Sequence, residues 1–329
     1  LILILIILIT VTGCNNNESN IHETFEIDNN MQKEYKPEYG GQITLPLTAL
    51  TTLNPLINEN TSYYHFSKLI FEGLFELDED LNIKNQLAKD YRIEEGGKVI
   101  NIKLKDNIVW HDGEKFTGED VAFTINTIKH SNNESIYEKM FNIFGTFNLK
   151  DFSKIIDVEI LDDYNIKIIF DKGFSNNLEI LTFPIIPKHK FVQGKEDKKA
   201  YINALAVDEY IPIGTGHYKF ESYEKYRTIK LKSFEEHRDG KAYIDSVVGK
   251  ILEDENLSLT ALETGQIDLT TGIDYDWEKY DQNNRIRIYE FISPNYEFLG
   301  FNFSNEIFNN KNGYRLRKAM AYGIDRQAI

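Results

Sequence analysis

The stretch NIVWHDGEKFTGEDVAFTI, residues 107–125, has the pattern of a turn followed by the start of a helix. Asp112-Gly113 comes directly after an apolar run, which is typical of a tight turn. Thr117 and Asp120 are spaced like the two partners of a capping box, so they predict a helix that begins after Thr117. The side chains expected on the buried face of this helix are Val121, Ile125 and Ile128.

Short segments in which apolar and polar residues alternate lie on both sides of this stretch. Ile100, Ile102 and Leu104 alternate with polar residues, as the side chains of a half-buried strand do. Similar patterns predict strands at 42–47, 166–170, 217–220, 228–232, 266–272 and 296–305. In the last of these, the core face would consist of Leu299, Phe301 and Phe303.

Helical spacing of apolar residues predicts three further helices. The first would carry Phe66, Leu69, Ile70 and Leu74 on one face and stop at Gly73. The second spans 257–263 and ends before Gly265. The third lies in 314–329, has Leu316, Met320 and Ile324 on one side, and shows no stop signal at Ile329. Because strands and helices do not alternate strictly, we expect an α/β fold of the mixed α+β kind.

The N-terminus has the pattern of a targeting segment. Residues 1–9 are all Leu or Ile, a run that suits a signal peptide and is too short to span a bilayer as a helix. Val11-Thr12-Gly13-Cys14 resembles a bacterial lipobox, in which the cysteine thiol takes a lipid. We expect 1–14 to be part of a lipoprotein signal peptide, with residues missing before Leu1 and lipidation at Cys14. The alternative is a core strand followed by a buried thiol.

Composition narrows the classes of partner. A formal net charge of −15 over 329 residues argues against nucleic acid and against a polybasic contact with anionic lipid. Residues 15–38 are rich in Asn, Glu and Asp with little apolar periodicity, so we expect a flexible tether.

The residue pattern gives little sign of catalysis or metal binding. The seven histidines are scattered, and none has a second His or Cys at metal-ligand spacing, so no dedicated metal site is expected. Gly214-Thr215-Gly216 lacks the third glycine of a dinucleotide fingerprint and predicts a tight turn before a strand. We expect no cofactor, no catalytic residue and no enzyme; the enzyme alternative is a secreted glycosidase that uses two carboxylates.

Residues 107–125 resemble the signature segment of the extracellular solute-binding proteins of peptide ABC importers, of the oligopeptide- and dipeptide-binding type. The family usually has Gly-Thr-Gly-Pro-Tyr where this chain has His217 in place of Pro, which affects only the rigidity of that turn. Further stretches resemble the family in the same order: TLNP at 52–55, IFEGLFELD at 70–78, LAKDYRIEEGGKVINIKLK at 87–105, PIGTGHYKF at 212–220 and YRLRKAMAYGIDRQAI at 314–329.

The resemblance implies a two-lobed periplasmic-binding-protein-like fold with an inserted subdomain, which closes on its ligand by a hinge. Lobe I would then comprise 39–62 and 184–271, and its inserted subdomain 63–183. Residues 272–329 would begin lobe II. Because the family continues beyond the last helix, lobe II is expected to be truncated in this chain.

The resemblance also implies a function. The protein would be a monomeric, lipid-anchored receptor on the extracellular face of the bacterial cell membrane, or in the periplasm. It would capture oligopeptides and deliver them to the permease subunits of an ABC importer. The alternative within this class is a receptor for a nickel chelate or another small solute.

Two groups of residues are expected at the ligand. Tyr63, Tyr64 and His65 precede the buried stripe of the first helix and correspond to a loop that borders the peptide cleft in the family. Their alternative role is to pack a tyrosine on the helix as a hydrophobic staple. The opposite wall would be formed by Asn295, Tyr296 and Glu297, whose alternative role is a plain surface turn.

Overall fold

The computed structural model describes residues 37–131, 134–138, 155–174, 176–194, 196–254, 257–271, 280, 283, 285–289 and 298–325. The expected signal peptide with Cys14, most of the expected tether, and the predicted wall residues Asn295, Tyr296 and Glu297 lie outside these ranges. Among the described residues, no helix is long and apolar enough to cross a membrane.

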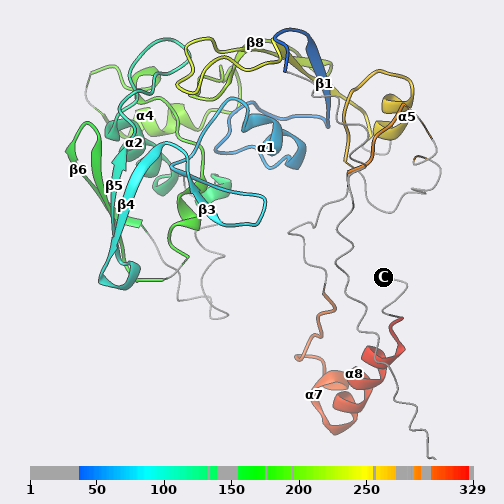
Figure 1. Ribbon diagram of the computed structural model, residues 1–329. Coiled ribbons are helices and arrows are strands. Elements are labelled where there is room, and N and C mark those ends of the chain that lie inside the picture. Colours follow the sequence, from blue (N-terminus) through cyan, green and yellow to red (C-terminus); the bar gives the residue numbers. More distant parts are fainter. Residues whose placement is uncertain are drawn as a thin grey trace, which may run out of the picture. The chain divides into compact units, whose positions relative to one another are not determined.

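The described chain contains both strands and helices, which confirms the expected mixed α/β class (Figure 1). The strands are β1 (Gln42–Leu47), β2 (Phe75–Leu77), β3 (Ile83–Asn85), β4 (Ala88–Glu94), β5 (Val99–Leu104), β6 (Ile155–Asp162), β7 (Asn165–Phe170), β8 (Tyr218–Glu224), β9 (Thr228–Ser233) and β10 (Ser246–Ile251). The α-helices are α1 (Thr61–Ser67), α2 (Gly118–Lys129), α4 (Lys198–Ala204), α5 (Ser258–Glu263), α7 (Glu306–Asn309) and α8 (Lys311–Gly323). Three short 3-10 helices are η2 (Glu95–Gly97), η3 (Glu179–Thr182) and η4 (Lys188–Lys190).

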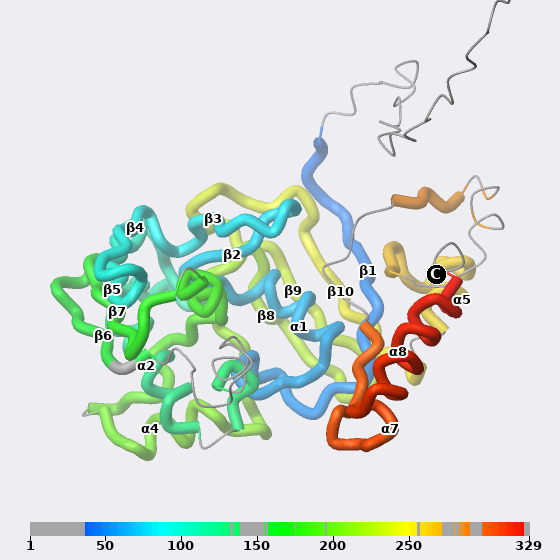
Figure 2. The backbone as a smooth tube through the Cα atoms, turned by 90° about the horizontal axis from the view of Figure 1, so that it is seen from below, coloured from blue at the N-terminus to red at the C-terminus, as the bar shows by residue number. Residues whose placement is uncertain are grey.

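One sheet joins the beginning of the folded chain to residues about 200 positions later. Its strand order is β1-β10-β9-β8, and β1 runs parallel to β10 while the other neighbours are antiparallel (Figure 2). The side chains that α1 and this sheet bury together include Leu47, Phe66, Ile229, Leu231 and Val247. The predicted strands at 42–47 and 228–232 are confirmed, and the strand predicted at 217–220 is β8, which begins one residue later.

A second, antiparallel sheet has the order β4-β5-β7-β6. The predicted strands at 100–104 and 166–170 are its central pair, and their alternate residues are buried as expected. Helix α2 contacts β6, and its apolar stripe of Val121, Ile125 and Ile128 is fully buried. The two sheets therefore have separate apolar cores, while the domain limits expected from the sequence stay a prediction.

The predicted capping box of α2 is present, and its residue Asp120 also accepts hydrogen bonds from outside the helix. Asp120 Oδ2 accepts hydrogen bonds from the backbone N–H of Thr117 at 3.0 Å and from Trp110 Nε1 at 3.3 Å. Its other oxygen accepts from the backbone N–H of Lys188 at 2.9 Å. Burial raises the pKa of this carboxyl, and these hydrogen bonds oppose the rise. Asp120 thus fixes the turn, the helix and the first residue of η4 to one another.

The helix predicted to reach Gly73 is wrong in length, because α1 ends at Ser67. Beyond the helix, the carbonyl oxygens of Leu69 and Ile70 accept hydrogen bonds from the backbone N–H groups of Tyr218 and Gly216, at 3.0 and 2.9 Å. This segment therefore pairs with a distant part of the chain instead of continuing the helix. Apolar spacing alone does not reveal that competing partner.

Two predicted strands are also wrong. Residues 266–271 form no strand; instead Asp268 alone attaches to the outer edge of β1, where its N–H donates to the Thr44 carbonyl at 2.8 Å and its carboxylate accepts from the Thr44 N–H at 2.7 Å. The described part of 296–305 has no strand either, and Leu299 and Phe303 are 54% and 52% exposed. The alternation of these residues therefore does not correspond to a core face here.

The two remaining helix predictions differ in their outcome. The helix predicted at 257–263 is confirmed as α5, and Gly265 follows it with a positive φ of 69°. The helix predicted within 314–329 exists as α8, but it begins at Lys311 and ends at Gly323, so Ile324 lies at its C-cap.

Replacing Asp120 tests how far α2 depends on this carboxylate. In the variant Asp120→Ala, three donors lose their acceptor, so we expect the free energy of unfolding to fall by more than about 2 kcal/mol. The matched control is Glu119→Ala, which removes an exposed partner of Lys188 and should cost less than about 1 kcal/mol. Urea denaturation measures both values, and equal losses would contradict this role for Asp120.

Candidate functional site

Helix α1 presents a small aromatic and cationic face. Tyr64 is half-buried and His65 is exposed; their rings meet edge to face with centroids 5.2 Å apart. The ammonium group of Lys68 lies 4.7 Å from the centroid of the Tyr64 ring, within range of a cation–π interaction. Burial, and then the charge of Lys68, lower the pKa of His65. This face, formed by Tyr64, His65 and Lys68, is called the α1 face below.

Tyr63 does not belong to the α1 face. Its side chain is 1% exposed, and its hydroxyl donates to the Leu53 carbonyl at 2.5 Å. Burial raises the pKa of this hydroxyl well above its ordinary value. The ring of Tyr63 therefore packs in the core, which argues against its predicted place at the ligand. The ligand-binding roles of Tyr64 and His65 stay predictions.

The start of α1 is held by a polar loop. Asn60 caps the helix, and its side-chain oxygen accepts from the Tyr63 N–H at 3.0 Å. The amide nitrogen of Asn60 donates to Thr48 Oγ1 at 2.7 Å, and the hydroxyl of Ser62 donates to the Asn60 side-chain oxygen, also at 2.7 Å. These contacts fix the direction in which α1 leaves the loop, and so they orient the α1 face.

His111 of the opening stretch is tied to the Gly214-Thr215-Gly216 turn. Nε2 of His111 lies 2.9 Å from the Gly216 carbonyl oxygen, and Nδ1 accepts from the Gly214 N–H at 3.2 Å. The backbone N–H of His111 also donates to the Gly214 carbonyl at 3.0 Å. The ring therefore serves as a neutral donor–acceptor. Burial is the main reason that its pKa falls to about 4.

The glycines of this turn are required by close contact with the chain. A Cβ atom at Gly214 would stand 1.8 Å from the Ile70 carbonyl oxygen, and one at Gly216 would stand 2.6 Å from that of Leu69. The sequence correctly predicts a turn here, but not the reason for the glycines.

Asp112, the residue after His111, binds His189 and Lys190 at 2.9 and 2.7 Å. Its partial burial raises the pKa of its carboxyl, but these contacts outweigh that effect and lower the pKa to about 2.

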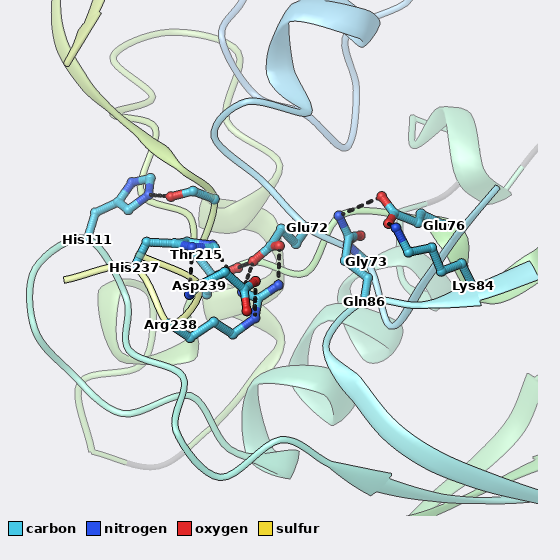
Figure 3. Close-up of polar contacts among 11 residues, drawn as sticks. Glu72, Gly73, Glu76, Lys84, Gln86, His111, Thr215, His237, Arg238 and Asp239 are labelled. Carbon is cyan, nitrogen blue, oxygen red and sulfur yellow. Dashed lines mark hydrogen bonds and ion pairs between the residues drawn. The ribbon is translucent and has the colours of Figure 1, made fainter. Parts of the chain in front are cut away.

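A buried ion pair lies beside the same turn (Figure 3). The guanidinium of Arg238 donates two hydrogen bonds to the Glu72 carboxylate, at 2.6 and 2.7 Å, and both side chains are 5% exposed. Thr215 Oγ1 donates to the same carboxylate at 2.8 Å. Glu72, His111, Gly214–Gly216 and Arg238 are together called the junction below, because they link four segments of the chain.

Next to the junction, the fold brings together three groups that can bind a metal. Donor atoms of His217, His237 and Asp239 all lie within 4.8 Å of one another. The two imidazole rings stack with centroids 3.6 Å apart, and burial, with His217 as the next cause, lowers the pKa of His237 to about 4. Spacing along the sequence does not reveal this cluster, because its histidines lie on either side of the β8–β9 hairpin.

The family model for bacterial extracellular solute-binding proteins, family 5 (middle region) matches residues 82–329. The chain belongs to this family. Residues 82–329 include the opening stretch, His111 and most of the junction. The family expected from the sequence motifs is thereby confirmed.

Three known proteins are similar to this chain over most of its length. The oligopeptide-binding protein AppA of Bacillus subtilis is 28% identical over 89% of the chain and 52% of its own length. The glutathione-binding protein GsiB of Salmonella paratyphi A is 25% identical over 85% of the chain and 51% of its own length. NikZ of Campylobacter jejuni, solved with Ni(L-His), is 26% identical with a TM-score of 0.64, over 88% of the chain and 54% of its own.

The solved structure of AppA in complex with a nonapeptide has a TM-score of 0.70 to this chain, at 24% identity over 89% of the chain and 55% of AppA. The likeness confirms the expected periplasmic-binding-protein-like fold. The chain spans about half the length of the curated relatives it matches.

The titration of His111 gives a pH-dependent contribution to stability. The pKa of an unfolded histidine is about 6.5, whereas in the folded chain it is about 4. The unfolded state therefore binds the extra proton as the pH falls below about 6.5. We expect the free energy of unfolding to drop by roughly 2 kcal/mol between pH 7 and pH 5 from this group alone.

Urea denaturation of the original chain and of His111→Asn at both pH values measures this contribution. Lys219, Glu72 and Asp112 act on the ring in both directions, and their effects are included in the folded pKa. The variant should lose the pH-dependent part, whereas His130→Asn, at an exposed histidine, should keep it. The same pH dependence in His111→Asn and the original chain would rule out this interpretation.

Proposed function

We propose that this protein is the receptor of an ABC importer that captures oligopeptides outside the bacterial cell and delivers them to permease subunits. The observation that supports this best is the likeness to AppA, which extends over 89% of the chain and whose solved structure holds a nonapeptide. The receptor acts as a monomer and performs no catalysis. It binds its ligand between two lobes, and closure stabilises the complex only through the tighter binding of the closed state.

The α1 face is our candidate for one wall of the peptide site. A tyrosine ring offers flat apolar area with a polar end, which suits contacts that tolerate different peptide side chains. Lys68 and His65 place cationic or polar groups beside that ring, where they could receive a peptide carboxylate or main-chain carbonyl. Asn295, Tyr296 and Glu297 are proposed for the opposite wall, as the family resemblance implies.

The second candidate function is uptake of a nickel chelate or another small solute. The likeness to NikZ, solved with Ni(L-His), favours it, because this structure covers nearly as much of the chain as AppA does. The two candidates differ in what the receptor retains. Mass spectrometry and metal analysis of the receptor purified from its native host would detect bound peptide in the first case and nickel in the second.

Substitutions in the α1 face test the peptide site directly. In the complete receptor, Tyr64→Ala and His65→Ala should each weaken nonapeptide binding by about five- to thirtyfold, because each removes about 1 to 2 kcal/mol of contact. Isothermal titration calorimetry with a mixed nonapeptide library measures the affinity, and thermal denaturation should show little change in Tm.

The matched control is Tyr63→Phe. It removes the hydroxyl that bonds to the Leu53 carbonyl, so Tm should fall while peptide affinity stays unchanged. If Tyr64→Ala and His65→Ala lowered Tm and left affinity intact, the α1 face would be structural and the peptide site would lie elsewhere. If the original receptor bound neither nonapeptides nor Ni(L-His), both candidate functions would fail.

We further propose that Cys14 carries the lipid that anchors the receptor at the outer face of the cell membrane, after cleavage behind Gly13. The support is the apolar run at 1–9 and the small residues before the only cysteine. Stable anchoring requires two acyl chains or more, which a diacylglyceryl group supplies.

Replacing this cysteine tests the anchor in the native host. Cys14→Ala should leave the receptor uncleaved and without label from a radioactive fatty acid, whereas Thr10→Ala should still be cleaved and labelled. Fatty-acid labelling that persists in Cys14→Ala would exclude lipidation at this residue.

A further inference from the structure

His217, His237 and Asp239 come together from two ends of one hairpin. His217 directly precedes β8, and the other two residues follow β9, in the turn that leads to β10. Backbone hydrogen bonds fix this arrangement: the Phe234 N–H donates to the His217 carbonyl at 2.8 Å, and the His237 N–H donates to the Phe234 carbonyl at 3.3 Å. The backbone of the hairpin and of the turn after β9 thus places these three residues together.

His217 is open to a ligand, whereas His237 is buried and Arg238 contacts both His237 and Asp239. His217 is exposed, and among the described residues neither of its ring nitrogens takes part in a hydrogen bond. Nδ1 of His237 accepts from the Asp239 N–H at 3.2 Å, which leaves Nε2 as the second donor atom. The carboxylate of Asp239 is 61% exposed, and its Oδ2 lies 3.4 Å from Arg238 Nε. Two imidazole nitrogens and one carboxylate oxygen therefore lie within 4.8 Å of one another.

The charges around the cluster are compatible with a cation. Arg238 stands between two of the ligands, with Nη1 3.3 Å from His237 Nε2. Its charge is already balanced by the two hydrogen bonds to Glu72, which are 0.6 to 0.7 Å shorter. An ion that binds here displaces the longer contacts of Arg238 to His237 and Asp239, and the ion pair of Arg238 with Glu72 stays intact. The carboxylate of Asp239 then supplies negative charge to an incoming ion.

From this geometry we propose that His217, His237 and Asp239 form a binding site for a late first-row divalent metal ion, Zn²⁺ or Ni²⁺. Imidazole and carboxylate ligands suit these ions, whereas Mg²⁺ and Ca²⁺ prefer sites made of oxygen alone. Three protein ligands leave at least one coordination position open for water. The site contains no residue of the α1 face, so it is independent of the proposed peptide site and adds to the proposed function.

Titration with the free ions tests the proposal on the complete protein, prepared without a histidine tag and treated with a chelator. ZnCl₂ and NiCl₂ are added separately in a buffer that does not bind metals, and MgCl₂ serves as the comparison ion. We expect calorimetry to show one bound Zn²⁺ or Ni²⁺ per chain and no binding of Mg²⁺. Zn²⁺ should also raise Tm, because an ion that binds only the folded state stabilises it.

Variants locate the ion. His217→Asn and Asp239→Asn change exposed side chains and should each weaken Zn²⁺ and Ni²⁺ binding by about tenfold or more and abolish the rise in Tm. His130→Asn, at an exposed histidine outside both proposed sites, should bind as the original chain does. Undiminished binding in His217→Asn, loss of binding in His130→Asn, or absence of binding in the original chain would each overturn the proposal.

Discussion

The described part of the chain depends on the close contact between the Gly214–Gly216 turn and the carbonyl oxygens of Leu69 and Ile70. A single methyl group at Gly214 would overlap the Ile70 oxygen, so only glycine fits at this position. Because the two segments touch through their backbones, the carbonyls of 69 and 70 are used here and cannot serve a longer helix. The end of α1, the start of β8 and the position of His111 all follow from this contact.

The ion pair of Glu72 and Arg238 adds polar specificity to the same region. Removing two charges from water costs several kcal/mol per ion, and good geometry must offset that cost. Here two charge-assisted hydrogen bonds from Arg238 and one from the Thr215 hydroxyl satisfy the Glu72 carboxylate. The backbone carbonyl of Glu72 accepts a hydrogen bond from the Ile185 N–H at 2.9 Å. The pair therefore contributes more to the choice of one arrangement of the segments than to net stability.

The sequence predicts those features of the fold whose signals are local. Thr117 and Asp120 carry their capping signal within four residues, and Ile100, Ile102 and Leu104 show their buried face by alternation alone. The length of α1 depends on a partner almost 150 positions away, which no local pattern contains. Tyr63 lies three residues before the buried Phe66 on the same face of α1, so helical spacing already separates it from its neighbour Tyr64.

The candidate sites also differ in whether their residues are close in the sequence or only in the fold. Tyr64 and His65 were recognisable because a short motif and its family resemblance place them at the start of one helix. His217 and His237 meet across a hairpin, so their proximity depends on the register of β8 and β9 and not on spacing. A metal motif is visible in a sequence only where its ligands lie on one turn or helix.

The parallel pairing of β1 with β10 has a consequence for how the protein is made. Gln42 is paired with Ser246, so the first strand of the sheet lacks its partner until about 200 more residues have been synthesised. At 5 to 20 residues per second this delay lasts roughly 10 to 40 s. During that time β1 is an unpaired edge that folding cannot bury. A chain that cannot close its first sheet early stays unfolded for longer, and an unfolded chain is the form that a narrow secretion channel can pass.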